Sequence, residues 1–156
     1  MRPNKSGSTP LFVSLSASSA PVLEFLLPHF PASSFSAKNT VGLTPLHVAA
    51  ERGFAAGVAL CLSKAPASVD AVDKNGATAL HIAAFVGEVP CVDALLAAGA
   101  KDVKDERGKG PLCVAKIRGQ GGCAEAMERR GWKLSEGENE ELEKMTKPRP
   151  QQLALK

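Results

Sequence analysis

Two histidines and a cysteine recur at similar intervals in this 156-residue chain, and side chains of these types could bind a metal ion. His47 is followed 34 residues later by His81, and Cys113 follows 32 residues after that. Zinc requires its nitrogen and sulfur ligands at about 2.0–2.3 Å from one ion. If the three residues hold equivalent places on successive packed helices, they lie roughly 8–10 Å apart. We therefore predict no metal site and no cofactor, and expect each histidine to make hydrogen bonds that support its own unit.

Cys123 is the residue that best fits nucleophilic or redox chemistry. It follows Gly121 and Gly122 near the expected start of a helix, where the helix dipole can lower the pKa of a thiol. The structural alternative is a buried apolar role, because Cys91 and Val22 hold the same place in other units. No catalytic histidine, phosphate-binding glycine loop or paired-carboxylate pattern accompanies the cysteine. We therefore predict that the protein is not an enzyme, and we expect reduced thiols because the chain has no CxxC pair.

The elements that position these residues are repeated along the chain. Residues 42–50 read GLTPLHVAA, and residues 76–84 read GATALHIAA. Weaker copies are GKGPLCVA at 108–115 and GSTPLFV at 7–13. Four copies in register indicate an array of repeats. A second marker keeps the same spacing and comprises Ser18, Gly53, Gly87 and Gly119.

One unit is predicted to contain two short helices and a projecting turn. Thr44 is a suitable N-cap, and Pro45 is tolerated in the first helical turn. The apolar residues that follow have the i, i+3, i+4 spacing of one helix face. Gly53 allows the left-handed conformation that ends the helix, and 73–76 is a turn signal between units. Because such a unit cannot bury its apolar faces alone, it must stack on its neighbours.

These motifs resemble the ankyrin repeat. Residues 44–49 match its T-P-L-H-x-A signature, and residues 78–83 depart from it only at Ala79. The resemblance covers residues 4–132 and implies an all-α fold, an ankyrin-repeat solenoid of stacked helix–turn–helix units with projecting β-turn or hairpin loops. It assigns residues 1–132 to one ankyrin-repeat domain. The repeats are expected at residues 4–37, 38–71, 72–103 and 104–132.

The outer two copies depart from the pattern as the ends of a stack would. In the last copy Gly110 replaces the capping threonine, and Lys116 and Glu128 stand where the inner copies are apolar. Polar replacements are expected where a face of the last repeat meets water. We expect Trp132 to fold over this exposed end.

Residues 133–156 change in character and are predicted to form a charged, flexible C-terminal tail. Ser135 and Glu138 fit a capping box, so 136–145 could be helical. Such a helix has only Leu142 and Met145 to bury, which makes it marginal alone. The alternative is a short linear motif or a flap over the last repeat.

Composition excludes several classes of function. The net charge of +3 is too small and too scattered to predict a nucleic-acid partner. No stretch approaches the roughly 18 apolar residues that span a membrane, so no membrane partner is predicted. Aromatic residues make up only 4% of the chain, which argues against a large core around a roomy pocket. The serine-rich N-terminus could act as a targeting segment. Pro21 argues against cleavage after Ala20, and a cytoplasmic or nuclear location is expected.

The resemblance implies a non-catalytic protein-binding module, such as an adaptor, an inhibitor or an assembly factor, acting as a monomer. Ankyrin-repeat proteins generally bind through their turn tips and the exposed face of each first helix. Phe85 is the expected anchor because an aromatic residue at a surface position is typical of binding hot spots. The apolar strip and its basic neighbours predict a partner with apolar and acidic groups. Carried over position by position, the predicted binding residues are Val41, Leu43, Glu51, Arg52, Lys74, Asn75, Phe85, Val86, Arg107, Lys109, Ile117 and Arg118.

Three alternatives remain open at this point. The protein could be thiol-reactive through Cys123, or it could be one piece of a larger ankyrin-containing signalling protein. An exposed apolar face on the first repeat would favour the second of these. Phe85 could also pack sideways between repeats and take no part in binding.

Overall fold

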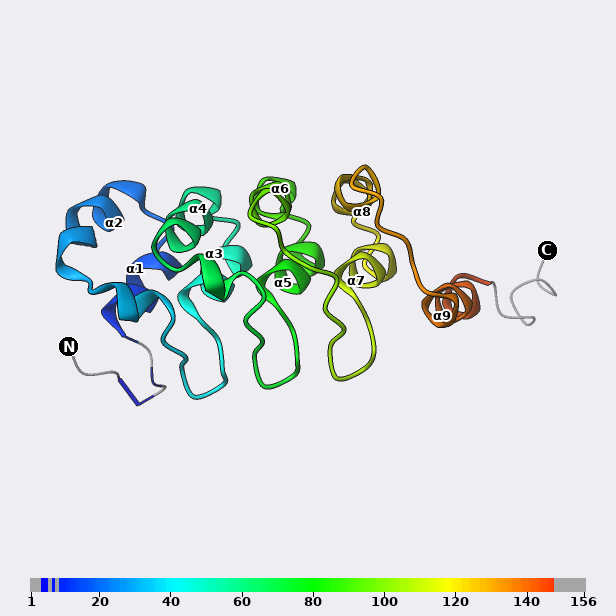
Figure 1. The fold of residues 1–156 in the computed structure, drawn as a ribbon, viewed down its shortest axis with the longest axis horizontal. Coiled ribbons are helices and arrows are strands. Elements are labelled where there is room, and N and C mark those ends of the chain that lie inside the picture. Colours follow the sequence, from blue (N-terminus) through cyan, green and yellow to red (C-terminus); the bar gives the residue numbers. More distant parts are fainter. Residues whose placement is uncertain (1–3, 6, 8, 148–156) are drawn as a thin grey trace, which may run out of the picture.

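The computed structural model describes residues 4, 5, 7 and 9–147, and over these residues the regular structure is helical apart from one isolated β-bridge between Val72 and Thr78. Successive helices pair into hairpins that stack side by side along the long axis, and a last helix follows them (Figure 1). The predicted all-α solenoid is confirmed. Each predicted repeat range contains one hairpin, while residues 148–156 of the predicted tail lie outside the described residues.

The first helices of the hairpins are α1 (Pro10–Ser16), α3 (Pro45–Glu51), α5 (Ala79–Val86) and α7 (Pro111–Ile117). The second helices are α2 (Ala20–Leu26), α4 (Ala55–Lys64), α6 (Val89–Ala97) and α8 (Gly121–Glu128). Short 3-10 helices occur at η1 (Leu27–His29), η2 (Ala32–Phe35) and η3 (Pro66–Ser68). The last helix is α9 (Glu136–Thr146). None of the described helices is long and apolar enough to cross a membrane.

The inner hairpins begin with a capping box that also joins one repeat to the next. The backbone N–H of Thr44 donates to Nδ1 of His47 at 3.1 Å, so Nδ1 is unprotonated and Nε2 carries the proton. Nε2 of His47 in turn donates to the carbonyl of Ala77, in the next repeat, at 3.1 Å. His81 makes the equivalent bond to the carbonyl of Lys109 at 3.0 Å. The predicted supporting role of the histidines is confirmed, and the bond to the following repeat adds to it.

These histidines are held in the neutral form. Burial lowers the pKa of His47 and of His81, and this effect outweighs the hydrogen bonds from their rings to backbone carbonyls, which raise the pKa. Both ring nitrogens of each histidine form hydrogen bonds within the scaffold. Over the described part of the chain, no group of three or more His, Cys, Asp or Glu residues is placed to hold a metal ion.

Each projecting turn is folded by one side chain at its start. Oδ1 of Asp73 accepts hydrogen bonds from the N–H groups of Asn75 at 2.8 Å and Ala77 at 2.9 Å. Asn39 and Asp105 do the same in the preceding and following turns. Backbone hydrogen bonds also join neighbouring turns, from Lys74 N–H to Val41 O and from Glu106 N–H to Asn75 O. The turn tips therefore form one connected edge of the molecule.

Small and medium apolar side chains fill the space between hairpins. Leu46, Leu80 and Leu112 hold one repeat position and are each at most 3% exposed. Ala49 and Ala83 are fully buried, as close packing of thin hairpins requires. All four cysteines are also buried and free. The stretch considered as a targeting segment contributes α1 and α2 to this core.

The two ends of the stack differ. At the C-terminal end, Lys116 and Glu128 form an ion pair at 2.6 Å, and half-buried Trp132 packs on the core. At the N-terminal end, Val22 is 46% exposed and Phe25 is 76% exposed. The buried role inferred for this repeat position holds for Cys91 and Cys123, whose helices α6 and α8 each pack against the second helix of the preceding hairpin, but it is wrong for Val22 in the first hairpin.

Candidate functional site

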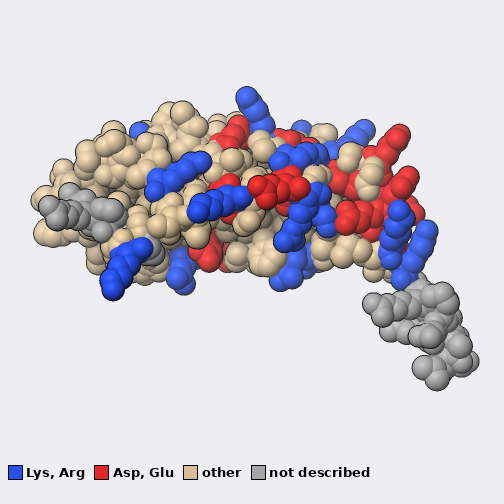
Figure 2. Space-filling model, turned by 90° about the horizontal axis from the view of Figure 1, so that it is seen from below, with Lys and Arg blue, Asp and Glu red and all other residues tan. Residues whose placement is uncertain are grey.

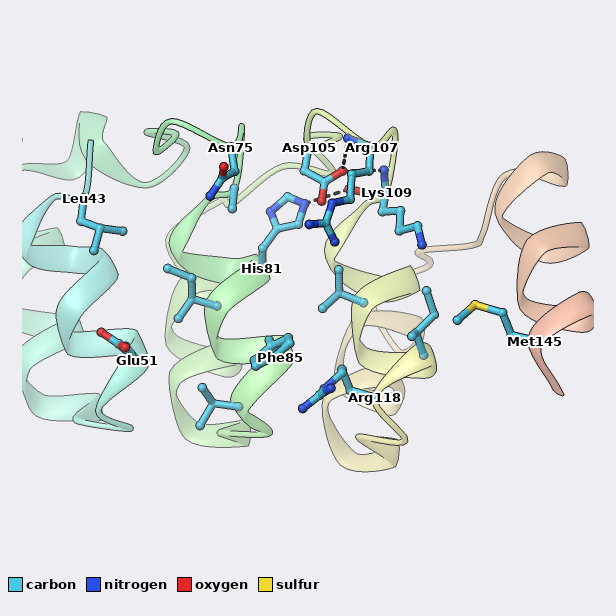
Figure 3. A pocket seen from close by; sticks show the side chains of 15 residues that line it. Leu43, Glu51, Asn75, His81, Phe85, Asp105, Arg107, Lys109, Arg118 and Met145 are labelled. Carbon is cyan, nitrogen blue, oxygen red and sulfur yellow. Dashed lines mark hydrogen bonds between the residues drawn. The ribbon is translucent and has the colours of Figure 1, made fainter. Parts of the chain in front are cut away.

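A groove of about 630 Å³ lies along the turn tips and first helices of the last two hairpins (Figure 3). Its lining comes from α5, α7 and the projecting turns, with Glu51 at the end of α3, Arg118 just after α7 and Met145 from α9. The buried face of α5 contains Leu80, Ala83 and Ala84, whereas Ile82, Phe85 and Val86 lie on its other faces and line the groove. The same helical spacing applies to α7. The scaffold therefore presents a row of side chains, of which Phe85, Val86 and Arg118 lie outside the core cluster.

Phe85 lies in the groove with its side chain half exposed, at 50%. The guanidinium carbon of Arg118, from the following hairpin, lies 4.1 Å from the centre of the Phe85 ring. This distance is within the range of a cation–π interaction. The ring is thus partly covered by the next repeat and partly open, rather than packed away between repeats.

The groove gathers most of the predicted binding residues. Three of them, Val41, Arg52 and Lys74, lie outside its lining on exposed positions. Binding of a partner by any of these residues stays a prediction. The predicted residues that line the groove are Leu43, Glu51, Asn75, Phe85, Val86, Arg107, Lys109, Ile117 and Arg118.

The lining also includes residues that the sequence reasoning did not select. Ile82 and Val114 stand at the variable position of the T-P-L-H-x-A signature, and this place in the repeat was the signal that could have found them. Met145 was not selected because it was assigned to the tail. Ala77, a turn-tip position in the repeat, also lines the groove, and together with His81 and Asp105 it has a hydrogen-bonding role in the scaffold.

The basic side chains that line the groove differ in whether they form an ion pair. Nζ of Lys109 lies 3.0 Å from Oε1 of Glu141 on α9. Arg107 and Arg118 form no ion pair with any described residue. Charged side chains of both signs spread over the middle and C-terminal parts of the molecule, whereas the N-terminal part is largely uncharged (Figure 2).

Helix α9 is attached to the last hairpin through a buried carboxylate. Glu138 is 4% exposed, and its Oε1 accepts a hydrogen bond from Gly110 N–H at 2.7 Å. Nζ of Lys104 lies 2.9 Å from both carboxylate oxygens. Ser135 completes the predicted capping box, donating its N–H to Oε2 at 2.9 Å. Burial raises the pKa of Glu138, but the hydrogen bonds from Gly110, Lys104 and Ser135 outweigh it and lower the pKa to about 2.

Glu138 takes a role that histidine has in the inner repeats. Gly110 stands where the inner repeats have a threonine, whose N–H donates to the histidine of the same repeat. Cys113 replaces that histidine in the last repeat and cannot accept such a bond as well. The carboxylate of Glu138, 28 residues away, accepts it instead.

Cys123 lies in surroundings that favour the neutral thiol. It is 1% exposed. Burial raises its pKa, and the nearby carboxylates of Glu88 and Asp93 raise the pKa further. A reactive cysteine needs the thiolate and access to it, so no observation at this site favours the thiol-reactive alternative.

Comparison with known proteins gives consistent matches to the repeat. The model of the family described as ankyrin repeats, in three copies, matches residues 55–130. Neurogenic locus notch homolog protein 1 of Xenopus tropicalis is 36% identical over 114 residues, and that of Homo sapiens is 38% identical over 110 residues. These matches cover 72% and 70% of this chain.

The relatives are much longer than the region they share with this chain. The chain spans only 4% of the length of either notch homolog. Alpha-latrotoxin-Lg1a of Latrodectus geometricus is 32% identical over 87 residues, which cover 56% of this chain and 6% of the toxin. Proteins with such different names share the repeat, so the similarity concerns the scaffold rather than a common task.

Proposed function

The chain is an ankyrin-repeat protein, and from this premise we propose that it binds another protein in the groove of Figure 3, without catalysis. Ankyrin repeats are protein–protein interaction modules, and the family is generally non-catalytic. The observation that carries the proposal is Phe85, which is half exposed in a groove with Arg118 against its ring. Binding hot spots are enriched in aromatic residues and arginine.

The proposed partner offers apolar and acidic groups. The apolar side chains of Ile82, Val86 and Ile117 line the same groove as Phe85 and favour an apolar insert. Arg107 and Arg118 have no ion pair in the described part of the chain and favour carboxylates. An adaptor, an inhibitor and an assembly factor can all use such a surface, and the three differ in what the bound partner does. The monomeric state and the cytoplasmic or nuclear location stay predictions.

Replacement of Phe85 by aspartate tests this function in the full-length chain. Phe25→Asp is a matched control, because Phe25 is a more exposed ring, at 76%, that lies outside the groove lining. Loss of a hot-spot side chain costs about 2 kcal/mol or more of binding free energy. We therefore expect affinity capture with quantitative mass spectrometry to show partners with the wild type and Phe25→Asp that Phe85→Asp loses. Circular dichroism checks that both variants are folded. Retention of every partner by folded Phe85→Asp would contradict the proposal.

A further inference from the structure

Helix α9 contacts the groove along the same face that anchors it. Glu138, Glu141 and Met145 are spaced by three and four residues, so they project from one side of the helix. Glu138 is bound to Gly110 and Lys104, Glu141 is paired with Lys109, and Met145 lines the groove. In Figure 3 the side chain of Met145 extends from α9 toward α7. The acidic helix therefore reaches from the end of the stack to the groove wall.

The contacts of α9 differ in strength along its length. The side chain of Glu138 is 5% exposed and has several hydrogen-bond donors, whereas the side chain of Glu141 is 48% exposed and pairs with one lysine. The Lys109 side chain is 18% exposed, but Glu141 is half exposed and forms an ion pair with this lysine alone among the described residues. An ion pair with one half-exposed partner is weaker than the buried contacts of Glu138, so Glu141 is replaced at Lys109 more readily than Glu138 is at Gly110. A buried, hydrogen-bonded carboxylate is costly to remove from its donors. The first turn of α9 thus holds the helix in place while its later turns are exchangeable.

We propose that α9 is an intramolecular ligand of the groove, and that the natural partner contributes an acidic amphipathic segment that replaces Glu141 at Lys109. The proposal rests on the proposed function of the groove and specifies its partner and its regulation. The groove lining contains three basic side chains, Lys109, Arg107 and Arg118, and two acidic ones, Glu51 and Asp105. Asp105 accepts hydrogen bonds within its own turn, and Glu51 lies on α3, away from α9 (Figure 3). Charge complementarity next to α9 therefore supports an acidic partner, since the chain's own occupant of Lys109 is a glutamate. Met145 indicates that the same segment carries an apolar side chain next to its carboxylates.

The tether gives α9 an advantage over any free ligand. A short connection leads from the end of α8 at Glu128 to the start of α9 at Glu136. Short flexible connections correspond to effective concentrations in the millimolar range. A partner segment with the same contacts, present at micromolar concentration, therefore binds only when α9 is weakened or when the partner makes further contacts, such as with Phe85. In this way α9 restricts binding in the groove to partners that contact further lining residues, such as Phe85, in addition to Lys109.

The test uses the full-length chain and a labelled synthetic peptide with the sequence of residues 134–147. In the Glu138→Gln/Glu141→Gln protein the intramolecular helix loses its carboxylate contacts, so we expect the peptide to bind at least tenfold more tightly than to the wild type by fluorescence anisotropy. The double variant Glu136→Gln/Glu140→Gln is the matched control. It removes the same charge from exposed positions of α9 and is expected to bind the peptide like the wild type.

Equal peptide binding by all three proteins, or an equal gain in both double variants, would overturn the proposal. Acetylation of Lys109 with an amine-selective reagent, followed by mass spectrometry, gives a second measurement if Glu138→Gln/Glu141→Gln folds poorly. The single variant Glu141→Gln should label Lys109 several-fold faster, and Glu140→Gln should not. Neither measurement uses a foreign partner, so their failure is distinct from a failure of Phe85→Asp to lose partners.

Discussion

At the scale of single residues, Glu138 shows how a charged side chain becomes part of the interior. A buried carboxylate is costly unless it is hydrogen-bonded. Here Gly110, Lys104 and Ser135 supply the donors, and they keep the group ionised. In return the carboxylate accepts the backbone N–H of Gly110, which has no histidine partner in its own repeat. The Glu138 side chain therefore accepts the N–H that lacks a histidine partner in the last repeat, and it also holds α9 in place.

Glu138→Gln is expected to lower the free energy of unfolding by about 1–3 kcal/mol at pH 7. Hydrogen bonds to a charged acceptor contribute about 1.5–3 kcal/mol, and the amide keeps the shape while losing the charge. Chemical denaturation with urea measures the change. Glu136→Gln, in the first turn of the same helix but exposed, should cost less than about 0.5 kcal/mol. A similar loss in both variants would show that the buried contacts of Glu138 do not matter.

The stabilisation by Glu138 should also depend on pH. Its pKa in the folded protein is lowered from 4.5 to about 2 by its hydrogen bonds, so the unfolded chain binds more protons between these values. The stabilisation is therefore complete above about pH 4.5 and is lost as the pH falls toward 2. The difference in unfolding free energy between the wild type and Glu138→Gln should shrink over this interval. A difference that stays constant down to pH 2 would contradict the assignment.

At the scale of elements, the projecting turns are joined by contacts that require glycine. Gly76 has φ +73°, and a Cβ there would lie 2.9 Å from the backbone nitrogen of Glu106 in the next turn. Gly108 has the same φ, but a Cβ there would meet nothing within 4 Å. The glycine is needed for conformation in both turns and for close approach only in the inner one.

Gly76→Ala and Gly108→Ala form a pair that separates these two causes. Both should lose about 1–2 kcal/mol, the cost of a left-handed conformation for a residue with a Cβ. Gly76→Ala should lose about 1 kcal/mol more, because the neighbouring turn must move away. Urea denaturation of the two variants gives the comparison. Equal losses would mean that the contact between turns adds nothing to stability.

Much of this element structure could be predicted from local sequence. The TPLH pattern at 44–47 contains the cap, the first helical turn and the histidine within four residues, so the inner hairpins follow from it. The capping box at Ser135 was recognised for the same reason. The sequence left a flap over the last repeat as an alternative, but the contacts that dock α9 could not be predicted, because no repeat pattern signals the bonds of Glu138 to Gly110 and Lys104.

The candidate site likewise contains residues that local sequence identifies and residues that only the tertiary structure brings in. Phe85 could be selected because the periodicity of α5 leaves it outside the core. Met145 could not, because its place in the groove follows from the position of α9. Ser18 is a smaller example, since only the structure shows that its φ of +51° lies in the left-handed region that the equivalent glycines also occupy.

At the scale of the whole molecule, the two ends of the stack have opposite character. The C-terminal end has an ion pair and a docked helix over its last hairpin. The first hairpin presents Val13, Val22 and Phe25 to solvent, and Leu23 is the buried residue of α2. The inner helices α5 and α6 are packed between neighbours on both sides. Stability is therefore expected to be uneven along the solenoid.

Native-state hydrogen exchange should show this gradient. The amides of α5 and α6 should exchange slowest, and those of α2 at least tenfold faster. Local opening is easier where few apolar contacts are broken. Exchange monitored by NMR or mass spectrometry at neutral pH measures the order. Protection of α2 equal to that of α5 would show that the stack opens as one cooperative unit.

The bonds from His47 to Ala77 and from His81 to Lys109 are the same junction used twice, and this has a consequence for changing the length of the protein. An extra copy of residues 38–71 inserted between residues 71 and 72 could form this histidine-to-carbonyl bond with the repeat on either side of it. The array could therefore grow from within while both ends stay as they are. The same copy placed after residue 132 would part Gly110 from Glu138 and deprive that carboxylate of its donors. A repeat can therefore be added in the middle of the stack, whereas a repeat added after residue 132 would break the contact that holds α9.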